Sequence, residues 1–130
     1  MRRILLAIVW SVLVVVASVA APTASAQSGV FAGTWTSTDT DGSSQELMIR
    51  GSGQGSYAVV LVDDAASVCD GVPAMFTGSG VATDDTLAVA GALTCLPGGN
   101  PFRGRIGFGF EYSSETDTLS DVTGVTWYRS

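Results

Sequence analysis

The side chains of this chain best suited to chemistry are its carboxylates, and most of them occur in close pairs. Two neighbouring carboxylates can act as general acid and general base, as in glycosidases, when a pocket raises the pKa of one of them. These pairs fall among turn-forming residues, where water surrounds a carboxylate, so the sequence predicts no such pocket. The pairs are Asp39 with Asp41, Asp63 with Asp64, Asp84 with Asp85, and Glu115 with Asp117.

Asp39, Asp41 and Gly42 form an Asp-x-Asp-Gly run, which is similar to the start of a calcium-binding loop. An EF-hand loop also needs a glutamate at position 12, and Arg50 stands there, so an EF-hand site is excluded. Aspartate and glycine are equally typical of tight turns. We predict a turn at this place, with weak calcium binding as the alternative.

The chain contains no histidine and no lysine, and these absences exclude several kinds of catalyst. Without histidine there is no imidazole base, no Ser-His or Cys-His dyad, and no ordinary zinc or copper site. Without lysine there is no Schiff base. We therefore expect no catalytic residues, no metal and no cofactor, and we do not expect an enzyme.

The first 26 residues are typical of a secretory signal peptide. Arg2 and Arg3 precede a long apolar run, and Ala24-Ser25-Ala26 follows it as a small-residue cleavage site. An uncleaved membrane anchor is the alternative, because the run of about 18 apolar residues approaches the ~20 that cross a bilayer. In either case we expect the remaining domain to be exported.

Cleavage would leave one domain, residues 27–130, that is secreted or extracytoplasmic and not attached to a membrane. It would remove two of the six cationic residues and none of the twelve acidic ones, so the formal net charge would change from −6 to −8. This charge repels polyanions, and we therefore expect neither nucleic acid nor an anionic lipid surface as a partner. The same charge also favours solubility.

Cys69 and Cys95 are the only two cysteines of the chain. In an exported domain they predict a single disulfide, with a redox-active pair as the alternative. On the loop-entropy argument the bridge would contribute roughly 3–4 kcal/mol to the free energy of unfolding. It would tie a loop of roughly residues 64–72 to the neighbouring strands.

Glycine, proline and acidic residues divide the domain into short runs rich in β-branched and aromatic residues, which is typical of strands. Because most links are short, neighbouring strands should pair antiparallel as an up-and-down meander. We predict an all-β fold, a small barrel of about seven to eight strands, after an N-terminal signal helix. Seven runs mark strands near 33–39, 44–52, 56–63, 73–82, 86–96, 102–113 and 119–129.

Alternation within two of these runs indicates which side chains face inward. In 102–113 an apolar row alternates with arginine, glycine and glutamate, which predicts a half-buried strand. In 86–96 the face opposite the leucines is made of alanine and threonine, so it is small enough to be covered. The inward row of 102–113 is Phe102, Ile106, Phe108, Phe110 and Tyr112.

The first strand opens with Gly33-Thr34-Trp35, a Gly-x-Trp sequence, and the last ends with Trp127-Tyr128-Arg129. This pairing of ends resembles the calycin superfamily of up-and-down barrels, which includes lipocalins, fatty-acid-binding proteins and avidins. In that superfamily a first-strand tryptophan packs against a final-strand cation and closes one end. The resemblance implies that Trp35 and Arg129 form this clasp. The avidin row of pocket tryptophans is missing, and an unrelated small sandwich or partial barrel is the alternative.

A barrel of this kind has its default binding site inside its open end. We expect a small apolar ligand there, unless the interior is filled entirely by the barrel's own side chains. The alternative function is a surface-mediated protein-binding module, such as a protease inhibitor or adhesion domain. An extracellular protein would then contact the loops 63–73 and 97–101. The expected ligand-binding residues are Phe76, Phe108, Phe110, Tyr112 and Trp127.

Overall fold

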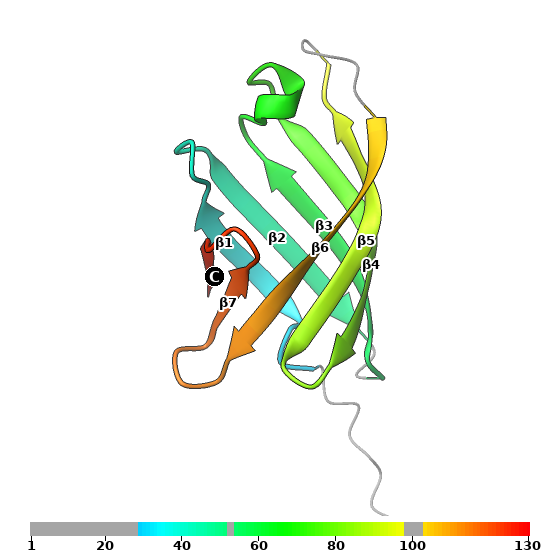
Figure 1. Ribbon diagram of the computed structural model, residues 1–130, viewed down its shortest axis with the longest axis vertical. Helices are drawn as coiled ribbons and strands as arrows, with labels where there is room; N and C mark the ends of the chain where they lie inside the picture. Colours follow the sequence, from blue (N-terminus) through cyan, green and yellow to red (C-terminus); the bar gives the residue numbers. More distant parts are fainter. Residues whose placement is uncertain (1–28, 52–53, 98–102) are drawn as a thin grey trace, which may run out of the picture.

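The computed structural model describes residues 29–51, 54–97 and 103–130. In these ranges eight antiparallel strands follow one another around a closed barrel, so the predicted all-β meander is confirmed (Figure 1). The predicted signal peptide and its helix, residues 1–26, lie outside the described residues. The strands are β1 (Gly33–Thr38), β2 (Ser44–Gly51), β3 (Ser56–Asp63), β4 (Ala74–Thr83), β5 (Thr86–Cys95), β6 (Arg103–Ser113), β7 (Thr118–Asp121) and β8 (Thr126–Arg129).

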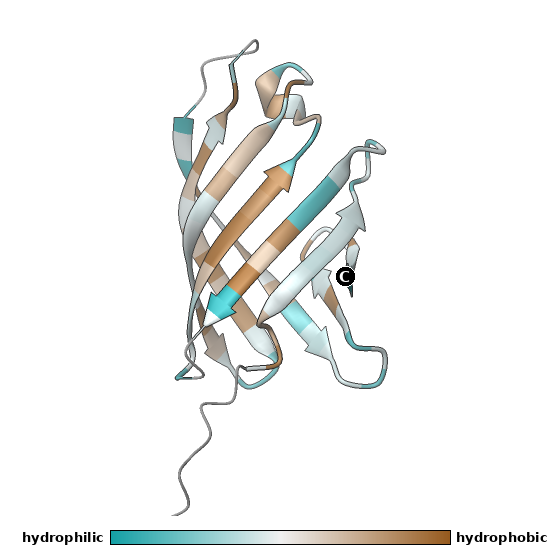
Figure 2. Cartoon of the chain, turned by 180° about the vertical axis from the view of Figure 1, so that it is seen from behind, coloured by the Kyte–Doolittle hydropathy of each residue, from teal (hydrophilic) through white to brown (hydrophobic). Residues whose placement is uncertain are grey.

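The barrel closes because β1 pairs with the last strand as well as with β2. Trp35 lies opposite Leu47 of β2 on one side and Arg129 of β8 on the other. Closure leaves no unpaired strand edge, which would otherwise be open to pairing with other chains. Inward side chains alternate with outward ones along each strand, and Figure 2 shows apolar segments along the strands with hydrophilic residues concentrated near strand ends and turns.

The single strand predicted at 119–129 is wrong, because a turn divides it into β7 and β8. The carboxylate of Asp121 accepts hydrogen bonds from the backbone N–H groups of Thr123, at 2.9 Å, and Val125, at 3.1 Å. Gly124 follows with φ of 86°, in the left-handed region that glycine adopts without strain. Asp121 therefore stabilises a chain reversal that the β-branched residues of this segment do not predict. The segment after the reversal forms the eighth strand.

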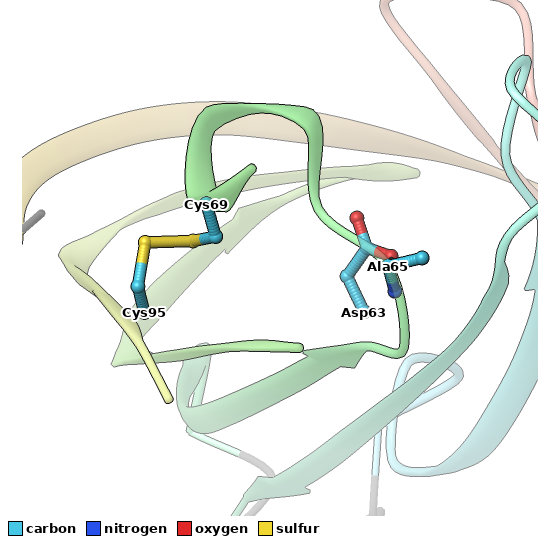
Figure 3. The surroundings of a disulfide bond; sticks show 4 residues. All are labelled: Asp63, Ala65, Cys69 and Cys95. Atoms are coloured by element: carbon cyan, nitrogen blue, oxygen red, sulfur yellow. A yellow bond between two sulfur atoms is a disulfide. The ribbon is translucent and has the colours of Figure 1, made fainter. Parts of the chain in front are cut away.

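The connection between β3 and β4 contains a short 3-10 helix, η1 (Ser67–Cys69), where the sequence predicted only a loop. The disulfide between Cys69 and Cys95 is confirmed, with a Cα–Cα distance of 5.4 Å (Figure 3). Because Cys95 at the end of β5 lies opposite Ala74 at the start of β4, the bridge holds this connection against the barrel wall. No helix in the described ranges is long and apolar enough to cross a membrane.

The interior is packed over much of its length by large apolar side chains. Trp35, Leu47, Phe76 and Leu87 have no exposed surface. The alanine and threonine face of β5 is exposed at Ala88 and Ala90 and half-buried at Ala92 and Thr94, so it is covered only in part. The barrel is thus stabilised from the inside, by contacts that bring inward side chains from all its strands together.

Candidate functional site

One end of the barrel is closed around Trp35 and Arg129. The guanidinium carbon of Arg129 lies 4.0 Å from the centre of the Trp35 ring, a distance at which a cation is attracted to an indole face. The same guanidinium donates hydrogen bonds of 2.9 Å to the carbonyl oxygens of Val30 and Ala32. The indole N–H of Trp35 donates to the carbonyl of Phe31, at 2.9 Å. The structure therefore brings the two residues of the expected clasp into contact and ties the segment before β1 over them.

Asp117 holds the guanidinium from the other side. Its carboxylate accepts two hydrogen bonds of 2.8 Å from Arg129, and these lower the pKa of Asp117 while they raise that of Arg129. The hydroxyl of Tyr112 donates to the same carboxylate at 3.1 Å. Burial is the main cause that raises the pKa of Tyr112, and the hydrogen bond to this carboxylate raises it further. The Tyr112 ring packs edge-to-face on Phe31 and Trp35, so this residue lies at the closed end.

The opposite end holds a pocket of about 300 Å³ inside the barrel. Four of the five expected ligand-binding residues line it, and their rings form a continuous edge-to-face series. Phe76 and Phe108 have ring centres 4.9 Å apart, Phe108 and Phe110 are 5.5 Å apart, and Phe110 and Trp127 are 5.8 Å apart. Tyr112, the fifth, does not line this pocket. The aromatic series gives the pocket an apolar floor.

Ile106 is more exposed than Phe108, Phe110 and Tyr112, the other described members of the predicted inward row. It lines the pocket and is 37% exposed. Phe102, the first member of that row, falls outside the described residues, as does most of the 97–101 loop. The pocket thus has a buried, apolar floor, and it opens to solvent beside Ile106.

Part of the pocket wall comes from the disulfide-bonded connection between β3 and β4. Ala66, Ser67 and Val68 line the pocket, and the adjoining Cys69 carries the bridge. The hydroxyl of Ser67 also donates to Asp41, at 3.2 Å, which joins this connection to the β1–β2 turn. The disulfide therefore fixes a segment that borders the pocket.

Three carboxylates also line the pocket, and sequence reasoning missed their role. Asp39 follows β1, Asp63 ends β3 and Asp121 ends β7. In an up-and-down meander all odd-numbered strands end at the same end of the barrel, so the predicted order could have placed Asp39 and Asp63 together. The single strand predicted at 119–129 put Asp121 near its start, at the other end, and the division into β7 and β8 corrects this. Gln45, at the start of β2, lines the pocket beside Asp63.

The carboxylates of the β1–β2 turn are engaged by the turn itself. Asp39 accepts a hydrogen bond from the backbone N–H of Thr40, at 2.7 Å, and Asp41 accepts one from that of Ser43, at 2.9 Å. Hydrogen bonds from Ser43 lower the pKa of Asp41. Within the described ranges no three histidine, cysteine or acidic side chains gather as a metal site. These hydrogen bonds are those of the turn predicted at residues 39–42.

A larger hollow of about 820 Å³ lies on the outer surface over β8, β1, β2 and β3. Its wall includes Thr36, Thr38, Glu46 and Tyr128, and it has no aromatic floor like that of the interior pocket. Ligand sites are typically concave and mostly apolar, with a few convergent polar groups. The smaller interior pocket meets this description better, so it is the candidate site.

Comparison of the chain with protein-family models, with curated proteins and with solved structures found no significant match.

Proposed function

We propose that this chain is an exported, calycin-like barrel that binds a small, largely apolar ligand and catalyses no reaction. The observation that carries the proposal is the pocket of about 300 Å³ floored by the aromatic series from Phe76 to Trp127. Its volume is at the lower end of the ~300–1,000 Å³ usual for ligand pockets, so the ligand must be small. Burying the ligand's apolar surface against these rings would stabilise the complex.

Several features support the calycin-like and exported character. Eight strands in meander order and the contact between Trp35 and Arg129 match the resemblance seen at the chain ends. A disulfide between Cys69 and Cys95 is typical of proteins outside the reducing cytoplasm. Among the described residues the pocket wall contains no histidine, lysine or cysteine, so no imidazole, amine or thiol can take part in a reaction there.

Ligand binding can be tested with N-phenyl-1-naphthylamine, an uncharged aromatic probe whose fluorescence rises in an apolar site. The full chain is produced with its leader, and the exported protein is titrated with the probe. We expect saturable binding. Replacing Ile106 with Trp would fill the mouth of the pocket, and we expect the probe affinity to fall about tenfold or more.

Val81→Trp is the matched control, because Val81 is also an aliphatic strand residue and is 60% exposed. It lies outside the pocket lining, so this variant should bind the probe as the unmodified protein does. A flat titration of the unmodified protein, or equal loss in both variants, would contradict the proposal.

The disulfide-bonded connection after β3 favours a second candidate, a surface that binds an extracellular protein. This segment is exposed at Ser67, Val68 and Asp70 and is held at Cys69, as loops that present a binding surface often are. Affinity capture from the extracellular fluid of the producing cells separates the candidates. A protein retained by the unmodified chain and lost with Val68→Asp, while the probe titration stays flat, would favour this second function.

A further inference from the structure

We infer that the ligand of this pocket carries a positively charged amine on its apolar body; this rests on the proposed function. The inference comes from the distribution of acidic and apolar residues in the pocket lining around the barrel. The carboxylate and amide side chains come from the consecutive strands and turns of β7, β8, β1, β2 and β3, where Asp121, Asp39, Gln45 and Asp63 lie. The hydroxyls of Thr123, in the β7–β8 turn, and Ser67, in the connection after β3, complete the polar lining. The facing strands supply apolar residues only: Ala74 and Phe76 from β4, Leu93 from β5, and Ile106, Phe108 and Phe110 from β6.

Asp121 keeps a negative charge at this wall although every partner it has is neutral. Burial opposes its ionisation, but hydrogen bonds from Thr123, Trp127 and the backbone N–H of Val125 outweigh burial and lower its pKa. One of these donors is the indole N–H of Trp127, at 3.1 Å, which links the carboxylate directly to the aromatic floor. A cation over this floor would thus lie beside a fixed negative charge.

Asp63 is the more unusual member, because it is a carboxylate only 9% exposed that forms no ion pair within the described residues. In the described part of the chain one oxygen accepts the backbone N–H of Ala65 at 3.1 Å, and the other accepts only the long contact of 3.4 Å from the side chain of Gln45 (Figure 3 shows Asp63 and Ala65). A carboxylate has about four acceptor positions, and a buried charge is costly unless it is paired. An ammonium group in the pocket would add donors at the remaining acceptor positions and a charge of opposite sign.

No cation in the described part of the chain takes this role. Within the described ranges the one ion pair joins Arg129 to Asp117 at the closed end. Arg50, Arg103 and Arg105 are exposed, and none of them lines the pocket. The aromatic floor adds attraction for a cation, because ring faces carry partial negative charge. The same field repels a carboxylate, so fatty acids and other anionic amphiphiles are disfavoured.

The test compares three ligands that share one apolar body: 1-naphthylmethylamine, 1-naphthalenemethanol and 1-naphthoate. Each is used to displace N-phenyl-1-naphthylamine from the exported protein at pH 7. We expect the amine to compete about tenfold better than the neutral alcohol, since a hydrogen bond to a charged group is typically worth that factor or more. The carboxylate should compete worst, and added salt should reduce the differences.

Asp63→Asn removes the charge while keeping the shape and the acceptor for Ala65. We expect this variant to lose most of the preference for the amine and to keep its affinity for the uncharged probe. Asp64→Asn is the matched control, because Asp64 is exposed at the same end and lies outside the pocket lining. It should retain the preference, which separates a local contact from the general charge of this end.

The outcomes separate the two proposals. If the uncharged probe binds but the amine competes no better than the alcohol or the carboxylate, the charge inference is wrong and the proposed function stands. If the probe does not bind at all, both are wrong. Should Asp63→Asn fail to fold, the ranking of the three ligands on the unmodified protein decides, because an amine that competes no better than the alcohol contradicts pairing with these carboxylates.

Discussion

The ring of Phe76 lies against the backbone of Gly91, so closely that a Cβ at Gly91 would come within 2.8 Å of the ring. Gly91 faces Gly78 across the β4–β5 pair, and the two glycines together leave the space that the ring occupies. Phe76 belongs both to the packed core and to the pocket lining. The boundary between the filled and the open part of the barrel therefore depends on two positions without side chains.

Gly91→Ala should destabilise the barrel by about 1–3 kcal/mol, the usual cost of overpacking a core. The added methyl group would overlap the carbonyl oxygen of Thr77 and the ring of Phe76, and neither can move without disturbing the strand pair. Urea unfolding followed by tryptophan fluorescence measures the loss. Gly107→Ala is the control, because there a Cβ would lie 3.4 Å from the nearest atom, the carbonyl oxygen of Val89. Equal stability of the two variants would contradict this account of the interior.

Arg129→Ala should lower the free energy of unfolding by about 2 kcal/mol, from the lost contact with the Trp35 ring and the hydrogen bonds left without a donor. Thermal unfolding measures the change. Arg129→Lys should recover only part of the lost stability. The planar guanidinium donates to two carbonyl groups and to Asp117 at once, and a compact ammonium cannot reach all of these acceptors. Arg105→Ala, at an exposed position, should leave the melting temperature nearly unchanged. If Arg129→Ala also leaves it unchanged, Arg129 does not act as a clasp.

Local patterns were sufficient to predict most strands, because glycine and acidic turns separate runs with a clear two-residue period. They failed at 119–129, where the reversal depends on the side chain of Asp121 capturing backbone N–H groups two and four residues ahead. Val122 and Thr123 are β-branched residues, which favour strands, so the hydrophobic pattern of the sequence gives no sign of a turn there. A single aspartate overrode the propensity of its neighbours.

The candidate site was predictable in its aromatic part and not in its acidic part. Phe108 and Phe110 lie in one alternating strand, so their shared face could be deduced from spacing alone. Asp63 and Asp121 lie far apart in the sequence and meet at the pocket only through the strand order of the closed barrel. Tyr112 points inward like Phe110, two residues earlier in β6, but it lies beyond the middle of the barrel, at the closed end. Alternation therefore specifies the inward face and not the depth along the barrel.

The stability of the barrel should fall in acid partly through Asp121. Its pKa is lowered in the folded state, so the carboxylate stabilises the fold fully above the ordinary pKa of aspartate, about 3.9. That contribution is lost as the pH falls through the lower folded pKa, because protonation removes the acceptor for Thr123, Val125 and Trp127. Asp121→Asn should therefore destabilise the protein near neutral pH and reduce the difference in stability between pH 6 and pH 3.

Urea midpoints measured between pH 6 and pH 3 for the unmodified protein and the variant give this difference directly. Asp85→Asn is the control, because Asp85 is exposed and its carboxylate makes no hydrogen bond within the described part of the chain, so the urea midpoint at pH 6 should stay nearly unchanged. Opening of the 122–125 turn should also release the indole of Trp127, so the acid transition of the unmodified protein should be visible in tryptophan emission. Parallel pH profiles for Asp121→Asn and the unmodified protein would show that this carboxylate does not hold the turn that creates β8.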